Sequence, residues 1–231
     1  MTEKLFSKNS YIKEFEAAVI AVNGNEIELD KTAFYPEGGG QPSDTGKIFS
    51  NGKEYYVTLV RKQIGKTVHL VEEEGLKPGD KIRGIIDWDR RHTLMRMHTA
   101  AHILSAVINR KTGALITGNQ LGIEQSRIDF SLDNFDKAQI INYVEEANNE
   151  INRKQEIKTY FVDKNHADAS LSKLAAGIGN VEEVKIVEIG DVDKQPDGGT
   201  HVRNTGEVGK IIFLKAENKG KNNRRIYFNL S

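Results

Sequence analysis

The hydrophobic pattern of this chain changes its period at Asp89, and this change limits the fold more than any other feature of the sequence. Before Asp89, short stretches of apolar and polar residues alternate about every 2 positions, which is typical of β-strands. After Asp89, apolar residues recur about every 3.6 positions, the period of an α-helix packed on one side. We therefore predict an α+β fold class, with an all-β barrel-like module in residues 1–89 and an α+β domain in residues 90–231.

Turn signals separate the predicted strands of the first module. Asn23-Gly24 and Asn51-Gly52 each lie between two β-rich segments, and Asn-Gly favours the type I′ turn of a two-residue β-hairpin. Strands are expected at residues 17–22, 26–29, 46–49, 55–60, 67–71 and 81–88. Many short strands with regular turns indicate a barrel or a sandwich.

Residues 35–46 interrupt this β pattern. The segment is too rich in Gly and Pro for a strand and too long for a tight turn, and long loops on rigid modules are often functional. Gln41 follows the run Gly38-Gly39-Gly40, where the missing side chains allow a ligand or another backbone to come close. Gln41 is therefore a candidate pocket residue; the alternative is that its amide braces the loop.

The second domain begins with a predicted helix whose core face steps by three and four residues. This face contains Leu94, Met97, Ala101, Leu104 and Ile108, and Gly113 is a suitable end. Two more helices are expected at residues 136–153 and 163–177, and strands at 184–189, 208–214 and 225–230.

Composition removes several classes of protein. The 231 residues include no Cys, which excludes disulfides, thiolate nucleophiles and Cys-ligated metals. No apolar run approaches the roughly 20 residues of a membrane span, and the N-terminus has no signal-peptide pattern, so we expect a cytoplasmic protein without a membrane segment. Lys+Arg and Asp+Glu balance at 33 each, so a polyanionic partner must meet a local basic patch.

Two histidines, His98 and His102, lie four residues apart on the first predicted helix. Residues at this spacing share one helix face about one turn apart, so their imidazoles can bind one metal ion. Position 99 is Thr, and the His-Glu-x-x-His pattern of zinc proteases, whose Glu is the general base, is absent. The pair thus indicates a metal site of another kind.

A second pair of candidate ligands, Asp197 and His201, flanks Gly198 and Gly199 in a predicted loop. Glycines allow a tight turn that points both side chains at one centre. His98, His102, Asp197 and His201 together make a tetrahedral set of four ligands. The alternative is an ordinary turn in which Asp197 is a turn former, which would leave three histidines and a water.

Three segments, in this order, resemble the editing domain of alanyl-tRNA synthetase and its free-standing AlaX-type trans-editing relatives. They are residues 38–46 (Gly-Gly-Gly-Gln-Pro-Ser-Asp-Thr-Gly), residues 98–102 (His-Thr-Ala-Ala-His) and residues 197–202 (Asp-Gly-Gly-Thr-His-Val). The resemblance covers nearly the whole chain, and it implies a glycine-motif β-barrel domain followed by a metal-binding editing domain. The family's zinc set is His-x-x-x-His plus Cys-x-x-x-His, and this sequence departs from it because Asp197 stands at the Cys position.

The resemblance implies a metal-dependent aminoacyl-tRNA deacylase that serves translation fidelity. Its substrate is the acceptor end of tRNA for alanine, wrongly charged with serine and, in some members, glycine; its cofactor is one Zn²⁺ per chain. Gln41 then borders the editing pocket. Thr99 and Thr200, next to candidate ligands, can present hydroxyls to a serine side chain, and such a site rejects the analogue that lacks the hydroxyl. Their alternative role is helix or turn capping.

A basic run near the C-terminus is the candidate RNA contact. Residues 209–225 carry a net charge of +5, which can neutralise phosphates; the alternative is a solvated loop. The candidate residues are Lys210, Lys219, Lys221, Arg224 and Arg225. A second candidate patch near the first helix contains Arg90, Arg91 and Arg96.

Two other functions remain open at this point. One is a non-catalytic tRNA-binding module whose metal is structural or lost, which the missing Cys favours. The other is a metallohydrolase for a different small ester or amide. Release of serine from charged tRNA distinguishes the first from a deacylase, and dependence of turnover on tRNA excludes the second. The sequence leaves the oligomeric state undetermined.

Overall fold

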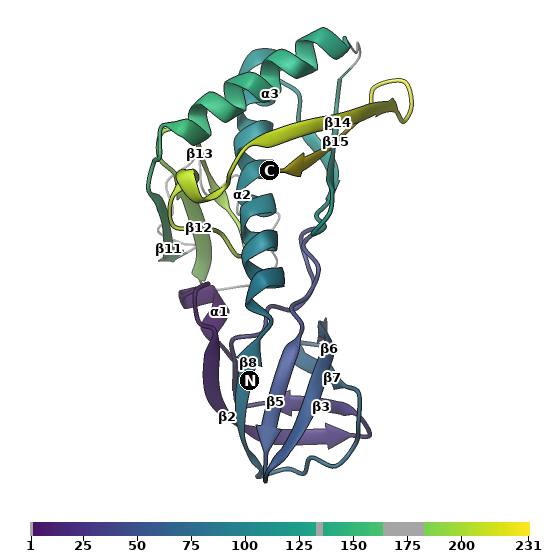
Figure 1. Cartoon of the computed structure of the whole chain (residues 1–231), viewed down its shortest axis with the longest axis vertical. Coiled ribbons are helices and arrows are strands. Elements are labelled where there is room, and N and C mark those ends of the chain that lie inside the picture. The colour runs from purple at the N-terminus through teal and green to yellow at the C-terminus, as the bar shows by residue number, and fades with distance from the viewer. Residues whose placement is uncertain (1, 133–135, 164–182) are drawn as a thin grey trace. The chain divides into compact units, whose positions relative to one another are not determined.

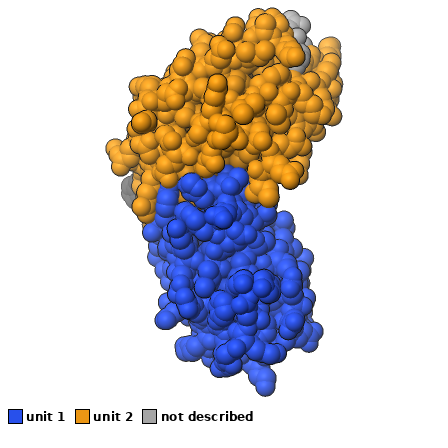
Figure 2. Space-filling model, viewed as in Figure 1, with its two compact units in different colours: residues 1–94 blue, residues 95–231 orange. Residues whose placement is uncertain are grey.

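The structure, a computed structural model, describes residues 2–132, 136–163 and 183–231 (Figure 1). It contains two compact units, residues 1–94 and residues 95–231 (Figure 2). The first unit is dominated by a β-barrel and the second combines helices with two sheets, so the predicted α+β class with an N-terminal barrel is confirmed. None of the described helices is both long and apolar enough to cross a membrane.

Six strands form the closed barrel of the first unit, in the order β2-β3-β7-β6-β5-β8. They are β2 (Glu14–Asn23), β3 (Glu26–Leu29), β5 (Gly46–Ser50), β6 (Lys53–Gln63), β7 (Lys66–Val71) and β8 (Lys81–Ile86). The unit also contains β1 (Glu3–Lys4), α1 (Leu5–Lys8) and β4 (Lys31–Thr32). Alternate residues of β2, namely Phe15, Ala17 and Val19, are buried, which is the period-2 pattern read from the sequence.

The barrel interior is filled by aromatic and branched side chains. Phe15 and Phe34 pack edge to face, with ring centroids 5.6 Å apart. Gly84 makes this arrangement possible, because a Cβ at that position would lie 2.5 Å from Cε1 of Phe15. A glycine in the middle of β8 therefore creates the space for a core phenylalanine.

The two predicted hairpin turns are both present, but they differ in type. Asn51 and Gly52 both have positive φ, 50° and 77°, as a type I′ turn requires. In the first hairpin Asn23 still pairs with Glu26, so the turn residues are Gly24 and Asn25, and only Gly24 has a positive φ, 60°. The expectation of a type I′ turn at Asn23-Gly24 was wrong by one residue.

The second unit contains most of helix α2 (Trp88–Thr112), helix α3 (Lys137–Asn152) and two sheets. One sheet has the order β14-β15-β10-β9, with β9 (Ile116–Gln120), β10 (Ser126–Phe130), β14 (Ile211–Asn218) and β15 (Arg224–Leu230). The other has the order β11-β12-β13, with β11 (Ile157–Asp163), β12 (Glu183–Ile189) and β13 (Asp193–Pro196). A short 3-10 helix, η1 (Thr205–Glu207), precedes β14.

Both predicted helices that lie in the described part of the chain are confirmed. The five residues of the predicted core face of α2 are buried, and Gly113, with φ 71°, follows the last turn and donates its N–H to the carbonyl of Asn109. Asp136 caps α3 by accepting from the backbone N–H of Ala138. The apolar face of α3 (Ile140, Val144, Ala147 and Ile151) is also buried.

Two other expectations have different outcomes. The strand expected at 208–214 begins only at Ile211, because Asn204 and Glu207 form a capping box around η1 and Gly209 has a φ of 82°. The helix expected at 163–177 lies outside the described residues except for Asp163, which ends strand β11.

Candidate metal centre

Helix α2 presents His98 and His102 on one face, as their spacing predicts. Their ring centroids lie 5.0 Å apart, and both side chains are almost fully buried. Met97 and Ala101 beside them are also buried, so the helix is anchored on both sides of the pair. This packing holds both imidazoles in place on the helix.

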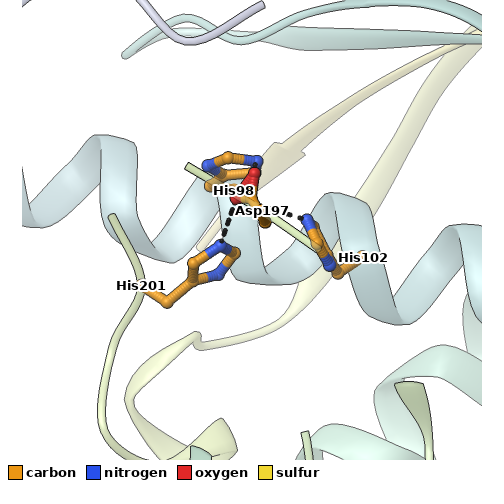
Figure 3. A group of neighbouring side chains, drawn as sticks. All are labelled: His98, His102, Asp197 and His201. Atoms are coloured by element: carbon orange, nitrogen blue, oxygen red, sulfur yellow. Dashed lines mark hydrogen bonds and ion pairs between the residues drawn. The ribbon is translucent and has the colours of Figure 1, made fainter. Parts of the chain in front are cut away.

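The loop that follows β13 brings Asp197 and His201 to this face (Figure 3). Asp197 continues the pairing of the sheet by donating its N–H to the carbonyl of Lys185, at 3.0 Å. The chain then turns, and the N–H of Gly199 donates to Oδ2 of Asp197, at 3.0 Å. A Cβ at position 199 would lie 2.2 Å from Cε1 of His98, so only glycine allows the loop to pass this close to the helix.

The four side chains converge on one point. Oδ2 of Asp197 lies 3.1 Å from Nε2 of His201, 3.6 Å from Nε2 of His98 and 4.0 Å from Nε2 of His102. One ligand atom from each of the four residues lies within 4.8 Å of the others. Ligand atoms of a tetrahedral ion with bonds of about 2.0–2.1 Å are about 3.3 Å apart. The donor set therefore fits a metal ion at its centre.

Neighbouring side chains hold two of the imidazoles by their other nitrogen. Nδ1 of His102 lies 2.8 Å from Oδ2 of Asp193, which also accepts from the amide of Gln195. Nδ1 of His201 lies 3.1 Å from Oγ1 of Thr99. Metal-ligating histidines commonly donate their second N–H to such partners, which fixes the tautomer that turns Nε2 toward the ion. Asp193 and Thr99 thus direct two nitrogens inward.

Burial is the largest single influence on the pKa of each of the four groups. It lowers the pKa of His98 well below the ordinary value and that of His201 to about 4. Burial also acts to lower the pKa of His102, but the hydrogen bond to Asp193 and the charge of Asp197 outweigh it and raise that pKa. Burial acts to raise the pKa of Asp197, and the three surrounding histidines outweigh it and hold that pKa well below its usual range. At neutral pH His98 and His201 are thus neutral imidazoles and Asp197 is a carboxylate, the forms that bind metals.

The sequence missed Asp193, Gln195 and Lys185, which surround the four candidate ligands. Asp193 and Gln195 alternate on β13 and therefore point to the same face of the sheet. Their position just before the loop was the available signal, but nothing in the sequence brings β13 to helix α2. Thr99 and Thr200 were predicted as site residues, and both are fully buried beside the cluster.

Gln41 belongs to the barrel unit, in the glycine-rich loop. Its backbone forms two hydrogen bonds with Gly38, of 3.0 and 3.1 Å, and its side chain is 1% exposed. The base of the loop is closed by Asp44, whose carboxylate accepts from the N–H of Tyr35 and from the guanidinium of Arg91. The loop around Gln41 is therefore a fixed structure within its own unit.

The predicted basic residues have three different environments. Lys210 and Lys221 are exposed. Lys219 and Arg225 pair with acidic groups, Glu217 and Asp129, at 2.8 and 2.7 Å.

Two arginines of the predicted patches are instead structural. Arg224 is buried, and its guanidinium donates to the carbonyls of Gly220 and Asn223 in its own hairpin, so its assignment as a phosphate-binding residue is corrected. Arg91, from the second predicted patch, is fully buried and cannot form part of a surface.

Two family models match the chain, and both describe parts of tRNA synthetases. Residues 184–227, which include the ligand loop, match the second additional domain of threonyl and alanyl tRNA synthetases. Residues 3–90 match the class II (A) tRNA synthetases. The barrel and the helix–loop site thus define the class of protein as an editing-type domain related to these enzymes.

Relatives that match this chain along their whole length identify the family within this class of proteins. The chain is 48% identical to the alanyl-tRNA editing protein AlaX-M of Methanosarcina barkeri, over 100% of this chain and 99% of that protein. It is 45% identical to AlaX-M of Saccharolobus solfataricus, over 99% and 98% of the two chains. It also matches the alanine–tRNA ligase of Pyrococcus abyssi at 39% identity, over 98% of this chain but 26% of the ligase. The chain belongs to the family of alanyl-tRNA editing proteins, as its motifs predicted.

Proposed function

We propose that this protein is a trans-editing hydrolase of the cytoplasm. It cleaves the ester that joins serine, or glycine, to the terminal ribose of tRNA for alanine, and it leaves correctly charged alanine in place. The observation that carries the proposal is the convergence of three Nε2 atoms and one carboxylate oxygen on a single point, in a chain of the alanyl-tRNA editing family. Residues 1–89 form the glycine-motif domain and residues 90–231 the editing domain.

One Zn²⁺ per chain is the proposed cofactor, with His98, His102, Asp197 and His201 as its ligands. Zinc takes four ligands of this type in a tetrahedral arrangement. Bound there, it supplies a Lewis acid to ester hydrolysis, either by activating water or by orienting the ester. Asp193 and Thr99 keep the ligand nitrogens directed inward. Asp197 replaces the Cys of the family pattern with a harder oxygen donor, which binds zinc less tightly than a thiolate.

The amino acid is distinguished by three residues in this proposal. Thr99 and Thr200 offer hydroxyl groups to the serine side chain. When Nε2 of His201 faces a metal, Nδ1 carries the proton and donates to Oγ1 of Thr99, so the Thr99 O–H is itself free to serve as a donor. Gln41 is the third residue, on the strength of the family's glycine motif, and the backbone hydrogen bonds of its loop hold it in place.

The tRNA is bound by basic residues of the β14–β15 hairpin and of the segment that precedes β14. Lys210, Lys219, Lys221 and Arg225 contact phosphates, and Arg224 keeps the hairpin in shape. Binding of this kind weakens as salt rises. Exchanging Lys210 and Lys221 for Ala together is expected to weaken tRNA binding and reduce the salt slope by about 2.

The deciding experiment is deacylation of Ser-tRNA and Ala-tRNA for alanine, side by side, with zinc-loaded and chelator-treated protein. Release of serine but not alanine, abolished by the chelator and restored by zinc, supports the proposal. Undiminished release by metal-free protein would contradict the metal-dependent mechanism. No release of serine with normal tRNA binding would favour the second candidate, a tRNA-binding module with a structural metal, for which the closed, fully protein-derived ligand set is the supporting observation.

A further inference from the structure

Lys185 is a buried lysine that the proposed mechanism does not use. It lies on β12 between Val184 and Ile186, which are fully buried, and its own residue is only 8% exposed. Lysine is almost never buried unless its ammonium is compensated, because removing the charge from water is strongly unfavourable. Such a residue in the middle of a strand therefore requires an explanation.

A hydrogen-bond partner of the ammonium lies in the loop that carries two of the four candidate ligands. Nζ of Lys185 donates to the carbonyl of Gly199, at 2.6 Å, midway between Asp197 and His201. The carbonyl of Lys185 accepts from the N–H of Asp197, at 3.0 Å, where the loop begins. One residue of β12 thus binds the loop twice, at its start by the backbone and at its centre by the side chain.

The loop needs such an anchor because of its own sequence. Gly199 cannot be exchanged for a residue with a Cβ without collision with His98, and it is preceded by another glycine. A glycine pair has the largest backbone freedom, so the turn between the two ligands has little stiffness of its own. A hydrogen bond from a charged donor to Gly199 supplies stiffness where the backbone lacks it.

The charges of the four candidate ligands and a bound cation do not require Lys185. Three neutral imidazoles, one carboxylate and a divalent cation already sum to a positive site. The ammonium is near enough to act against protonation of all three histidines, so it also repels a cation. What Lys185 contributes to the site is its hydrogen bond to the loop.

We infer that Lys185 is a positioning residue of the cation site: its ammonium holds the Gly199 carbonyl and so fixes the turn that presents Asp197 and His201 to one centre. This inference rests on the proposed metal site. It predicts that removal of the ammonium moves Asp197 and His201 away from His98 and His102 and weakens cation binding. Loss of the electrostatic repulsion alone would have the opposite effect and strengthen cation binding.

The test uses Co²⁺ as the probe, because its visible absorption reports the geometry of the bound ion. Lys185→Met keeps the length and burial of the side chain without its charge. It is expected to weaken Co²⁺ binding by about 10-fold or more, the effect typical of outer-sphere partners, and to reduce the tetrahedral absorption bands. Lys158→Met on the neighbouring strand β11 is the matched control, since Lys158 is 60% exposed; it should leave both readouts unchanged.

A chemical rescue separates positioning from folding. The chain has no Cys, so Lys185→Cys can be alkylated at that one site with bromoethylamine in denaturant and then refolded, which restores an ammonium at nearly the same reach. Recovery of Co²⁺ affinity and absorption supports the inference. Circular dichroism establishes that each variant is folded, and Lys185→Leu replaces Lys185→Met if the latter does not fold.

The outcomes are distinct. Equal Co²⁺ affinity and equal spectra in the native and Met or Leu proteins would overturn the role of Lys185 and leave the metal site intact. A native protein that takes up no Co²⁺ would overturn the proposed metal site together with this inference.

Discussion

Two glycine-containing loops of this protein are held by buried basic side chains, and they are held differently. In the barrel unit, Arg91 closes the loop of residues 35–46 through the carboxylate of Asp44, and both side chains are fully inaccessible to solvent. In the second unit, Lys185 holds the 197–201 loop through a backbone carbonyl. In the first loop, the carboxylate of Asp44 is paired with the guanidinium of Arg91. In the second loop, the carboxylate of Asp197 is not bound by the lysine and instead faces the three histidines.

The difference shows how a carboxylate becomes part of a site. Both carboxylate oxygens of Asp44 accept hydrogen bonds, from Arg91 and from the N–H of Tyr35, so this carboxylate stabilises the loop and does not face a ligand site. Asp197 accepts the backbone N–H of Gly199 and faces three Nε2 atoms, one of which, that of His201, lies within hydrogen-bond distance. Arg91 also donates to the carbonyls of Ser10 and Ala33, which makes it a central connection of the barrel unit.

The largest expected effect is therefore on stability, from Arg91→Met. It leaves Asp44 buried without its charged partner, and breaking a buried pair in this way costs about 3–5 kcal/mol. Urea denaturation measures the change. Arg83→Met is the control, because its pair with Glu14 is exposed, and its effect should be much smaller. Equal effects of the two variants would refute the structural role assigned to Arg91.

The next largest effect is a fall in the free energy of unfolding of the barrel at acidic pH. Burial lowers the pKa of His69 to about 4, and its Nε2 lies 2.8 Å from the hydroxyl of Thr32. The unfolded chain has an ordinary His pKa of about 6.5, so the unfolded state binds a proton first. The contribution of His69 is complete above about pH 6.5 and is lost as pH falls toward 4, amounting to about 3 kcal/mol. The free energy of unfolding of native protein and His69→Gln between pH 7 and pH 4 measures it; the native protein should lose more.

A smaller effect, on metal affinity, is expected when the hydrogen-bond partner of His102 is removed. Asp193→Ala removes the acceptor that orients this imidazole and should reduce zinc affinity by about 10- to 100-fold. Asp191→Ala, an exposed aspartate two residues earlier, is the control. Competition with a chromogenic chelator gives both affinities, and identical values would exclude orientation of His102 by Asp193.

The position of Asp197 itself can be tested by three substitutions. Asp197→Cys restores the family donor and should bind zinc more tightly, because thiolate is the softer ligand. Asp197→Ala should release the metal more readily, and the loss should deepen at low pH, where histidines protonate. Asp197→Asn retains the turn but loses the charge. If Ala and Asn proteins bind zinc like the native one, Asp197 is outside the coordination set and three histidines hold the ion.

The smallest effect on stability is expected for Gln41→Ala, although its effect on activity is not small. If Gln41 borders the pocket, deacylation falls while tRNA affinity and thermal unfolding stay nearly unchanged. A large loss of stability with unchanged activity per folded molecule would instead assign its amide to bracing the loop.

Much of this architecture follows from local pattern. The barrel strands, helix α2 and helix α3 were predictable because alternation, helical periodicity and caps act within a few residues. Strands β9, β10, β11 and β13 were not predicted. β9 and β13 are short and polar, whereas β10 and β11 pair with strands far away in the sequence, β15 and β12. The first hairpin turned one residue late because pairing of Asn23 with Glu26 decided its register.

Residue type and spacing were enough to identify the four side chains that could form a metal site. The spacing of His98 and His102 places them on one helix face, and the glycine pair between Asp197 and His201 allows a tight turn. The side chains that surround these four follow only from the packing of the folded chain. Asp193 reaches His102 across 91 positions of the chain, and Lys185 supports a loop from a buried strand. Local sequence carries no signal for such contacts, because they depend on how a sheet and a helix pack together after each has formed.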